Sequence, residues 1–111
     1  MAGRTQLVNR LPAGKAGREY LTKQGNMFVY VLISEKDGRF YVGMSSNVEK
    51  RLKEHNAGRT KSTKGYRPWK LFLFETYETR QEARKREKYL KTGYGKQWLK
   101  EKYNRSYNSV G

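Results

Sequence analysis

The sequence predicts a small α/β domain, a three-stranded, largely antiparallel sheet flanked by helices in the order ββαβαα. Three observations predict it. Three short runs are rich in β-branched and aromatic residues, as half-buried strands require. Two segments have the hydroxyl-to-glutamate spacing of a helix capping box, followed by apolar residues at helical intervals. The chain of 111 residues is long enough for one hydrophobic core but not for two.

The first two strands are predicted to form a hairpin. Met27–Ile33 and Arg39–Met44 are the apolar runs, and Lys36-Asp37-Gly38 between them is a turn signal. We favour a four-residue loop over Glu35–Gly38. A three-residue loop is the alternative, and it would shift the register by one residue.

The hairpin register decides where two tyrosines lie. With the four-residue loop, Tyr30 is opposite Gly43 and Tyr41 is opposite Leu32, so both phenols share one face of the sheet. The shorter loop would place them on opposite faces, because a slip of one residue inverts a strand.

A helix is predicted directly after the hairpin. Ser46 and Glu49 have the spacing of a capping box, and Gly58 stands where a helix C′ glycine ends the helix. Val48 and Leu52 mark the inward stripe at a spacing of four residues.

Two basic side chains accompany that stripe. His55, the only histidine of the chain, continues the stripe at i+7, and Arg51 is one helical turn away from it. The two tyrosines, this guanidinium and this imidazole are therefore expected to converge.

A third strand and a basic loop follow the helix. Arg59–Arg67 contains hydroxyls, a glycine and several cations that can hold phosphate oxygens, although it also fits a plain exposed connection. In the strand Trp69–Phe74, strict alternation assigns residues 69, 71 and 73 to one face and residues 70, 72 and 74 to the other. Both faces are apolar, which predicts a central strand covered by helices.

The second helix carries an acid on its apolar side. Thr79–Glu82 is its capping box, and Gly93 is predicted to close it. Glu87 lies on the inward stripe between Ala83 and Leu90. Periodicity leaves two interpretations equal: a ligand of a cation, or the partner of Arg51 or a flanking lysine in a salt bridge. A short final helix is expected to begin near residue 97.

Charge favours a polyanionic partner. Twenty-five Lys and Arg residues against 10 Asp and Glu residues give a net charge of +15. Nucleic acid is the expected partner, because neutralising phosphates releases condensed counterions. The absence of cysteine excludes disulfides and thiolate zinc sites and is consistent with a reducing, cytoplasmic compartment. No apolar run is long enough to span a bilayer, and no secretory signal is recognisable.

The ends of the chain are predicted to add little to the fold. Residues 1–26 have no clear hydrophobic period and are interpreted as a flexible basic tail that contributes electrostatic affinity. The domain is assigned to residues 27–103, and residues 104–111 are expected to be frayed.

Several of these motifs resemble the GIY-YIG nuclease superfamily. The resemblance lies in Phe28-Val29-Tyr30, Tyr41-Val42-Gly43 and Arg51, and it extends over His55–Gly58, Arg67–Trp69 and Arg86–Lys88. It covers residues 27 to about 103 and is greatest to the small single-domain bacterial members, which are similar to the nuclease domains of excision-repair and structure-specific endonucleases. Two positions depart from the family pattern: Phe-Val replaces Gly-Ile, and Met44 replaces a basic residue often found after the second motif.

The resemblance implies a divalent-metal-dependent endonuclease that acts on DNA, more than on RNA, in repair or recombination. It implies that Glu87 holds one Mg²⁺ or Mn²⁺ ion, and that Arg51 stabilises the charge that develops on the phosphate. Tyr30 or Tyr41 would accept the proton of the attacking water, and His55 would relay it. Phosphate contacts are expected from the loop residues Arg59, Lys61, Lys64 and Arg67.

Three other functions fit parts of the pattern. The first is a nucleic-acid-binding protein that keeps this scaffold without cleaving. The second is an RNA-recognition module, to which residues 38–43 bear a weak likeness, although that fold needs four strands in another order. The third, a ribosome-associated protein, rests on charge alone.

Overall fold

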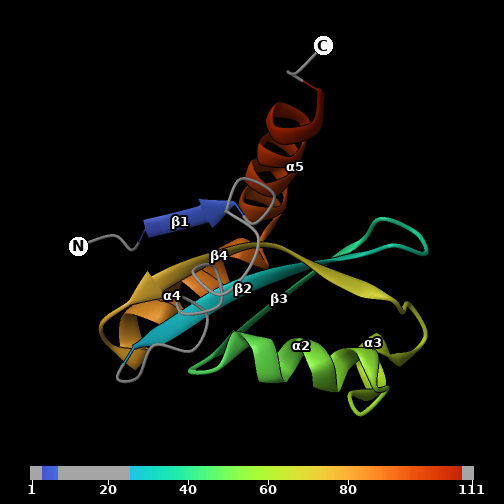
Figure 1. Cartoon of the computed structure of the whole chain (residues 1–111). Helices are drawn as coiled ribbons and strands as arrows, with labels where there is room; N and C mark the ends of the chain where they lie inside the picture. The colour runs from blue at the N-terminus through green and yellow to red at the C-terminus, as the bar shows by residue number, and fades with distance from the viewer. Residues whose placement is uncertain (1–3, 8–25, 109–111) are drawn as a thin grey trace.

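The computed structural model describes residues 4–7 and 26–108 of the chain (Figure 1). Its elements, in chain order, are β1 (Arg4–Leu7), β2 (Met27–Ser34), β3 (Phe40–Ser45), α2 (Val48–Asn56), α3 (Lys61–Lys64), β4 (Trp69–Tyr77), α4 (Arg80–Leu90) and α5 (Gly93–Asn108). None of the helices in these ranges has the length and apolar character needed to cross a membrane.

The predicted three-stranded antiparallel sheet is present and gains a fourth strand. The strand order is β1-β4-β2-β3, and every neighbouring pair is antiparallel. β1 pairs along the outer edge of β4, with Arg4 opposite Thr76 and Leu7 opposite Leu73. The interpretation of residues 1–26 as a tail that adds little to the fold is therefore wrong for residues 4–7, while residues 1–3 and 8–25 lie outside the described residues. β4 is an interior strand, as its two apolar faces predicted.

The hairpin has the predicted register. Tyr30 is opposite Gly43, Leu32 is opposite Tyr41, and the backbone N–H of Ser34 donates to the carbonyl of Arg39 over 2.9 Å. The four-residue loop is thus confirmed, and both tyrosines lie on one face of the sheet.

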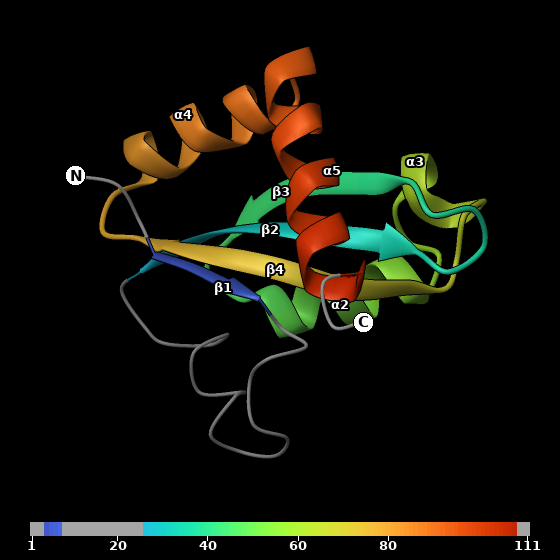
Figure 2. The ribbon, with the colours of Figure 1, turned by 90° about the horizontal axis from the view of Figure 1, so that it is seen from above.

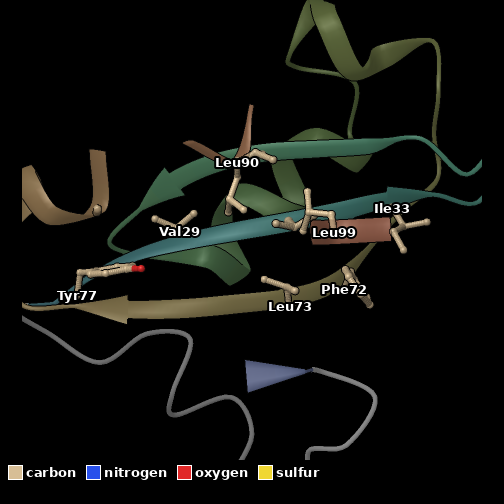
Figure 3. Close-up of a cluster of buried hydrophobic side chains, with 10 residues drawn as sticks. Val29, Ile33, Phe72, Leu73, Tyr77, Leu90 and Leu99 are labelled. Atoms are coloured by element: carbon tan, nitrogen blue, oxygen red, sulfur yellow. The ribbon is translucent and has the colours of Figure 1, made fainter. Parts of the chain in front are cut away.

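Helices cover both faces of the sheet. α4 and α5 lie on one side, and α2 lies on the other (Figure 2). β2 alternates between the two layers: Val29, Val31 and Ile33 pack toward α4 and α5 (Figure 3), whereas Phe28, Tyr30 and Leu32 join Val48 of α2. A strand with two buried faces is the most completely buried element of such a sheet.

A β-bulge in β4 corrects the predicted faces of that strand. Val31 of β2 is opposite Leu73 and Leu32 is opposite Leu71, so Phe72 is an extra residue between two paired ones. As a result Phe72 and Leu73 both pack in the α4–α5 layer, and Phe74 packs in the α2 layer. Strict alternation had assigned Leu73 and Phe74 each to the face opposite the observed one. The bulge explains the difference, because it exchanges the faces of all residues beyond it.

The first helix begins one residue later than its capping box predicted. Asn47, not Ser46, is the N-cap of α2, and its side-chain oxygen accepts the N–H of Lys50 over 3.0 Å. The predicted end is confirmed, because Gly58 follows the C-cap with a φ of +80°, which favours glycine. The one-turn helix α3 in the basic loop was not predicted.

The last two helices meet at a different point from the one predicted. Thr79 caps α4 as expected, and its hydroxyl accepts the N–H of Glu82. Gly93 does not close α4. It is the first residue of α5, which runs for 16 residues to Asn108. The final helix therefore begins before residue 97, and residues 104–108 are helical instead of frayed, while residues 109–111 lie outside the described residues.

Candidate active site

Two tyrosines and the histidine meet between the sheet and α2. The Tyr30 hydroxyl lies 3.1 Å from Nε2 of His55. The Tyr41 ring meets the imidazole edge-on, with 4.7 Å between the ring centroids. Tyr30 and His55 are buried, whereas Tyr41 is only partly buried. The convergence predicted from the hairpin register and the helical spacing is confirmed for these three side chains.

Gly43 makes this convergence possible. A Cβ atom at this position would lie 2.6 Å from the Tyr30 hydroxyl oxygen and 2.7 Å from Cζ. Because Gly43 is opposite Tyr30 in the register, the phenol crosses β3 in the space that a side chain would otherwise fill. The glycine thus determines where the Tyr30 hydroxyl lies.

His55 is held by hydrogen bonds at both ring nitrogens. Nε2 is within reach of Tyr30, and Nδ1 is 2.8 Å from the hydroxyl of Thr63. Burial lowers the pKa of His55, and the positive charge of Arg51 lowers it further, against an opposing effect of Glu54. The imidazole is therefore neutral at physiological pH, which is the form that can accept a proton.

Arg51 reaches the same hydroxyl from α2. Burial raises the pKa of Tyr30, and hydrogen bonding to Arg51 opposes that increase. The same interaction, together with Glu54, raises the pKa of Arg51. Nη1 of Arg51 also forms an ion pair of 2.6 Å with Glu54, one turn along the helix. The Tyr30 oxygen is thus a protonated phenol with His55 as an acceptor and with the permanent cation of Arg51 nearby.

Glu87 approaches from α4, in the opposite layer. Its side chain is only 16% exposed, and its Oε2 pairs with Nζ of Lys91 over 3.1 Å. Periodicity left Arg51 or a flanking lysine as the salt-bridge partner of Glu87. In the structure the partner is the flanking Lys91, whereas Arg51 pairs with Glu54. α4 contacts the edge strand β3, and the charge of Glu87 is close enough to raise the pKa of Tyr30, after the larger effect of burial.

Glu87 is the predicted metal ligand of the site, whereas the other nearby carboxylate, Glu54, is paired with Arg51. No group of three or more His, Cys, Asp or Glu side chains that could hold a metal occurs in residues 4–7 and 26–108. A closed protein cage for a metal is therefore absent from this region. A single hard oxygen ligand fits Mg²⁺, which commonly binds through one or two carboxylates and completes its shell with water and substrate phosphate.

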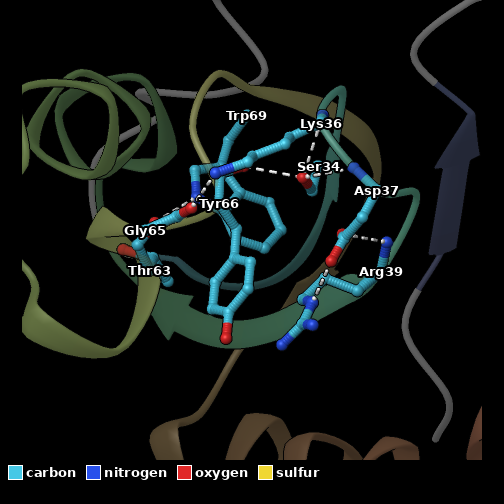
Figure 4. A network of polar contacts seen from close by, with 8 residues as sticks. All are labelled: Ser34, Lys36, Asp37, Arg39, Thr63, Gly65, Tyr66 and Trp69. Atoms are coloured by element: carbon cyan, nitrogen blue, oxygen red, sulfur yellow. Dashed lines mark hydrogen bonds and ion pairs between the residues drawn. The ribbon is translucent and has the colours of Figure 1, made fainter.

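The hairpin loop and the basic loop are joined beside this site (Figure 4). The Ser34 hydroxyl donates to the carbonyl of Tyr66 over 2.6 Å, and Nζ of Lys36 donates to the carbonyl of Gly65 over 3.2 Å. The guanidinium of Arg39 stacks 3.5 Å from the centroid of the Tyr66 ring. Cations from two distant stretches of sequence are thereby brought together on one surface.

A cavity of about 490 Å³ lies at this junction, lined by Lys36, Asn56, Lys64, Gly65, Arg67 and Pro68. Lys64 and Arg67 belong to the predicted phosphate contacts, and Lys36 joins them from the hairpin. Arg59 and Lys61, the other two predicted contacts, are exposed but do not line the cavity. The cavity is thus basic and open to an anion.

Two positioning contacts were not predicted from the sequence. The amide of Asn56 bonds reciprocally to the backbone of Trp69, at 2.8 Å to its carbonyl and 2.6 Å from its N–H. The Trp69 indole N–H then donates to the carbonyl of Thr63 over 2.8 Å. Asn56 ends α2 and Thr63 lies in the basic loop, and these pairings were not predictable because they form only when the chain folds back on itself.

Comparison with known proteins identifies the family of this chain. The model of the GIY-YIG catalytic domain matches residues 26–104, which span the hairpin, α2, β4 and α4. The chain belongs to the GIY-YIG family. A GIY-YIG catalytic domain indicates a nuclease, and Tyr30, Tyr41 and Gly43 lie within the matched residues.

Curated relatives align with about 60% of the chain. A UPF0213 protein of Clostridium perfringens is 46% identical over 65 residues, which cover 58% of this chain and 69% of that protein. One from Bacillus licheniformis is 40% identical over 67 residues (60% and 69%), and one from Haloquadratum walsbyi is 42% identical over 69 residues (60% and 78%). These names state no activity. No solved structure matches the chain with significance.

Proposed function

We propose that this GIY-YIG protein is a divalent-metal-dependent endonuclease that hydrolyses phosphodiester bonds in DNA, with a role in repair or recombination. The observation that carries the proposal is the buried contact of the Tyr30 hydroxyl with a neutral imidazole, beside Arg51. A core tyrosine needs only a satisfied hydroxyl. A phenol between a proton acceptor and a fixed cation is suited to moving a proton while a negative charge develops nearby.

In the proposed mechanism Tyr30 is the base. An unperturbed phenol titrates near 10, so at neutral pH it can take a proton from water only by passing its own proton on. Tyr30 has an acceptor for that proton in Nε2 of His55, at 3.1 Å. As the Tyr30 oxygen accepts the proton of the attacking water, its own proton moves to Nε2.

The remaining residues act on the phosphate. Arg51 lies beside the Tyr30 oxygen and donates to the phosphate oxygens, where its permanent charge stabilises the developing negative charge. Glu87 would hold Mg²⁺ or Mn²⁺, which supplies further positive charge to the phosphate and the leaving oxygen. Tyr41, partly exposed against the His55 ring, shields the relay from bulk water and contacts the substrate.

The basic junction is proposed to bind the flanking backbone. Lys36, Lys64 and Arg67 line its cavity, and Arg59 and Lys61 extend the positive surface along the same loop. Phosphate contacts of this kind fix the register of the nucleic acid without reading its sequence. The net charge of +15 adds long-range attraction.

One observation favours the alternative of a protein that binds nucleic acid without cutting it. The carboxylate of Glu87 already has a partner in Lys91, so its charge is accounted for without a metal. The pair is weak, because Lys91 is 54% exposed, and an exposed i,i+4 pair contributes about 0.3–0.5 kcal/mol. A divalent ion can therefore displace this lysine at little cost.

The test is a cleavage panel. Labelled DNA and RNA in single-stranded, duplex, nicked and branched forms are incubated with Mg²⁺, Mn²⁺ or EDTA. We expect cleavage of at least one DNA form, lost in EDTA and reduced about 100-fold or more in Tyr30→Phe, because general base catalysis contributes on this scale. Binding without cleavage of any substrate would support the alternative.

A further inference from the structure

We propose that Thr63 is a positioning residue that fixes the tautomer of His55, with the proton on Nδ1, and so makes Nε2 the acceptor for the Tyr30 proton. The catalytic part of this inference rests on the proposed function, whereas the tautomer itself does not. Thr63 lies in α3 of the basic loop, eight residues after His55, where the sequence predicted only a phosphate-binding or exposed connection.

The direction of the hydrogen bonds follows from the number of protons available. The Thr63 hydroxyl is 3.2 Å from the carbonyl of Thr60, which can only accept, and 2.8 Å from Nδ1 of His55. A hydroxyl has one proton to donate. If it donates to the carbonyl, it must accept from Nδ1–H, and the neutral imidazole then has its lone pair on Nε2, facing Tyr30.

The surroundings keep the Thr63 hydroxyl in this position. The side chain is 1% exposed, so water does not compete for its hydrogen bonds. Its backbone carbonyl accepts the indole N–H of Trp69, and Trp69 is in turn held by Asn56 of α2. The segment that carries the hydroxyl is thereby tied to the helix that carries His55. Histidines that transfer protons or bind metals commonly have a hydrogen-bond partner at the other ring nitrogen, which sets the tautomer and the ring orientation.

The charges around the imidazole favour the neutral form on which the tautomer depends. From α2, Arg51 disfavours a second proton and Glu54 favours it, while burial disfavours it most. The neighbouring groups on β2 and β3 are the phenols of Tyr30 and Tyr41. A neutral ring can carry its single proton on either nitrogen, so the partner on the loop side decides which one is free.

The first measurement needs no variant. His55 is the only histidine, so the ¹⁵N and ¹H correlations of the imidazole in a ¹⁵N-labelled sample report on this ring alone. Above neutral pH we expect the pattern of a single Nδ1–H tautomer. A ring protonated on Nε2, or an even mixture of the two forms, would overturn the proposal.

Two substitutions at Thr63 then separate its hydroxyl from its shape. Thr63→Val keeps the size and removes the hydroxyl, and Thr63→Ser keeps the hydroxyl. We expect Thr63→Ser to retain the Nδ1–H form and Thr63→Val to lose it as the sole form. A folded Thr63→Val protein with an unchanged tautomer would contradict the proposal. If Thr63→Val does not fold, the wild-type and Thr63→Ser spectra still decide.

Cleavage kinetics test the consequence. On a substrate that the wild type cuts, Thr63→Val should lower kcat by about 10-fold or more with little change in KM, because proton transfer is affected and phosphate contacts are not. Thr63→Ser should restore most of the rate. An equal kcat in all three proteins would remove Thr63 from the relay. If the wild type cuts nothing, the proposed function fails, while the tautomer measurement still tests the role of Thr63.

Discussion

Replacing Gly43 by alanine should disrupt both the core and the site. The added Cβ would lie 2.6 Å from the Tyr30 oxygen and 2.7 Å from Cζ, so the phenol must move by about 0.8 Å to reach an ordinary contact of 3.4 Å. Tyr30 is 1% exposed, so the phenol cannot simply turn into solvent. Overpacking of a core costs about 1–3 kcal/mol, and the loss of one hydrogen bond about 1 kcal/mol more. We therefore expect Gly43→Ala to lose about 2–4 kcal/mol of unfolding free energy.

The matched control is Gly65→Ala. A Cβ at Gly65 meets nothing within 4 Å, and its φ of −78° suits any residue, so this variant should stay within about 0.5 kcal/mol of the wild type. Urea unfolding followed by tryptophan fluorescence measures both variants. Since Tyr30→Phe removes the same hydrogen bond, its effect should not add to that of Gly43→Ala. Equal stability of Gly43→Ala and Gly65→Ala would refute the reasoning.

Three further outcomes are expected. The pKa of His55 is lowered in the folded state, so the free energy of unfolding should be constant above about pH 6.5 and should fall as the pH drops through the folded pKa, by at most about 1.4 kcal/mol per pH unit. If the unfolding free energy of His55→Gln still falls with the same slope between pH 6.5 and 5, this explanation is contradicted. Neutralising Lys36, Lys64 and Arg67 together should lower the slope of log Kd against log salt concentration for DNA by about two to three units. The control Lys96→Gln should lower this slope by about one unit at most. Unchanged slopes in an anisotropy titration would exclude the basic junction from DNA binding. A chain that starts at Met27 loses β1 but keeps both core layers. It should therefore melt cooperatively at a lower temperature, with about 1 kcal/mol of unfolding free energy lost per ladder hydrogen bond, and it should bind DNA more weakly. A non-cooperative melt would show that the first 26 residues are essential to the core.

Features encoded locally were predictable from the sequence. The hairpin register followed from a turn signal and a period of two, and the cap at Thr79 from hydroxyl-to-glutamate spacing. Because the register places Tyr30 and Tyr41 on the face that α2 covers, the convergence with His55 was predictable as well.

Features that depend on distant partners were not predictable. The bulge at Phe72 leaves no mark on an apolar run, yet it exchanges the faces of the residues that follow it. Gly93 has the composition of a helix end and starts α5 instead, because glycine alone does not distinguish the two roles. Thr63 and Asn56 act only once the loop has folded back onto α2, which no period in the sequence encodes.

The central claim, that this is a nuclease whose metal is held by Glu87, is tested most directly by comparing Glu87→Gln with Glu101→Gln. Both variants lose one negative charge, and Glu101 is an exposed acid on α5. With Mg²⁺ or Mn²⁺, Glu101→Gln should cut DNA at the wild-type rate. Glu87→Gln should bind DNA equally well or slightly more tightly and should show no cleavage. Its free energy of unfolding should lie within about 0.5 kcal/mol of the wild-type value. Cleavage by Glu87→Gln at the wild-type rate would contradict the claim.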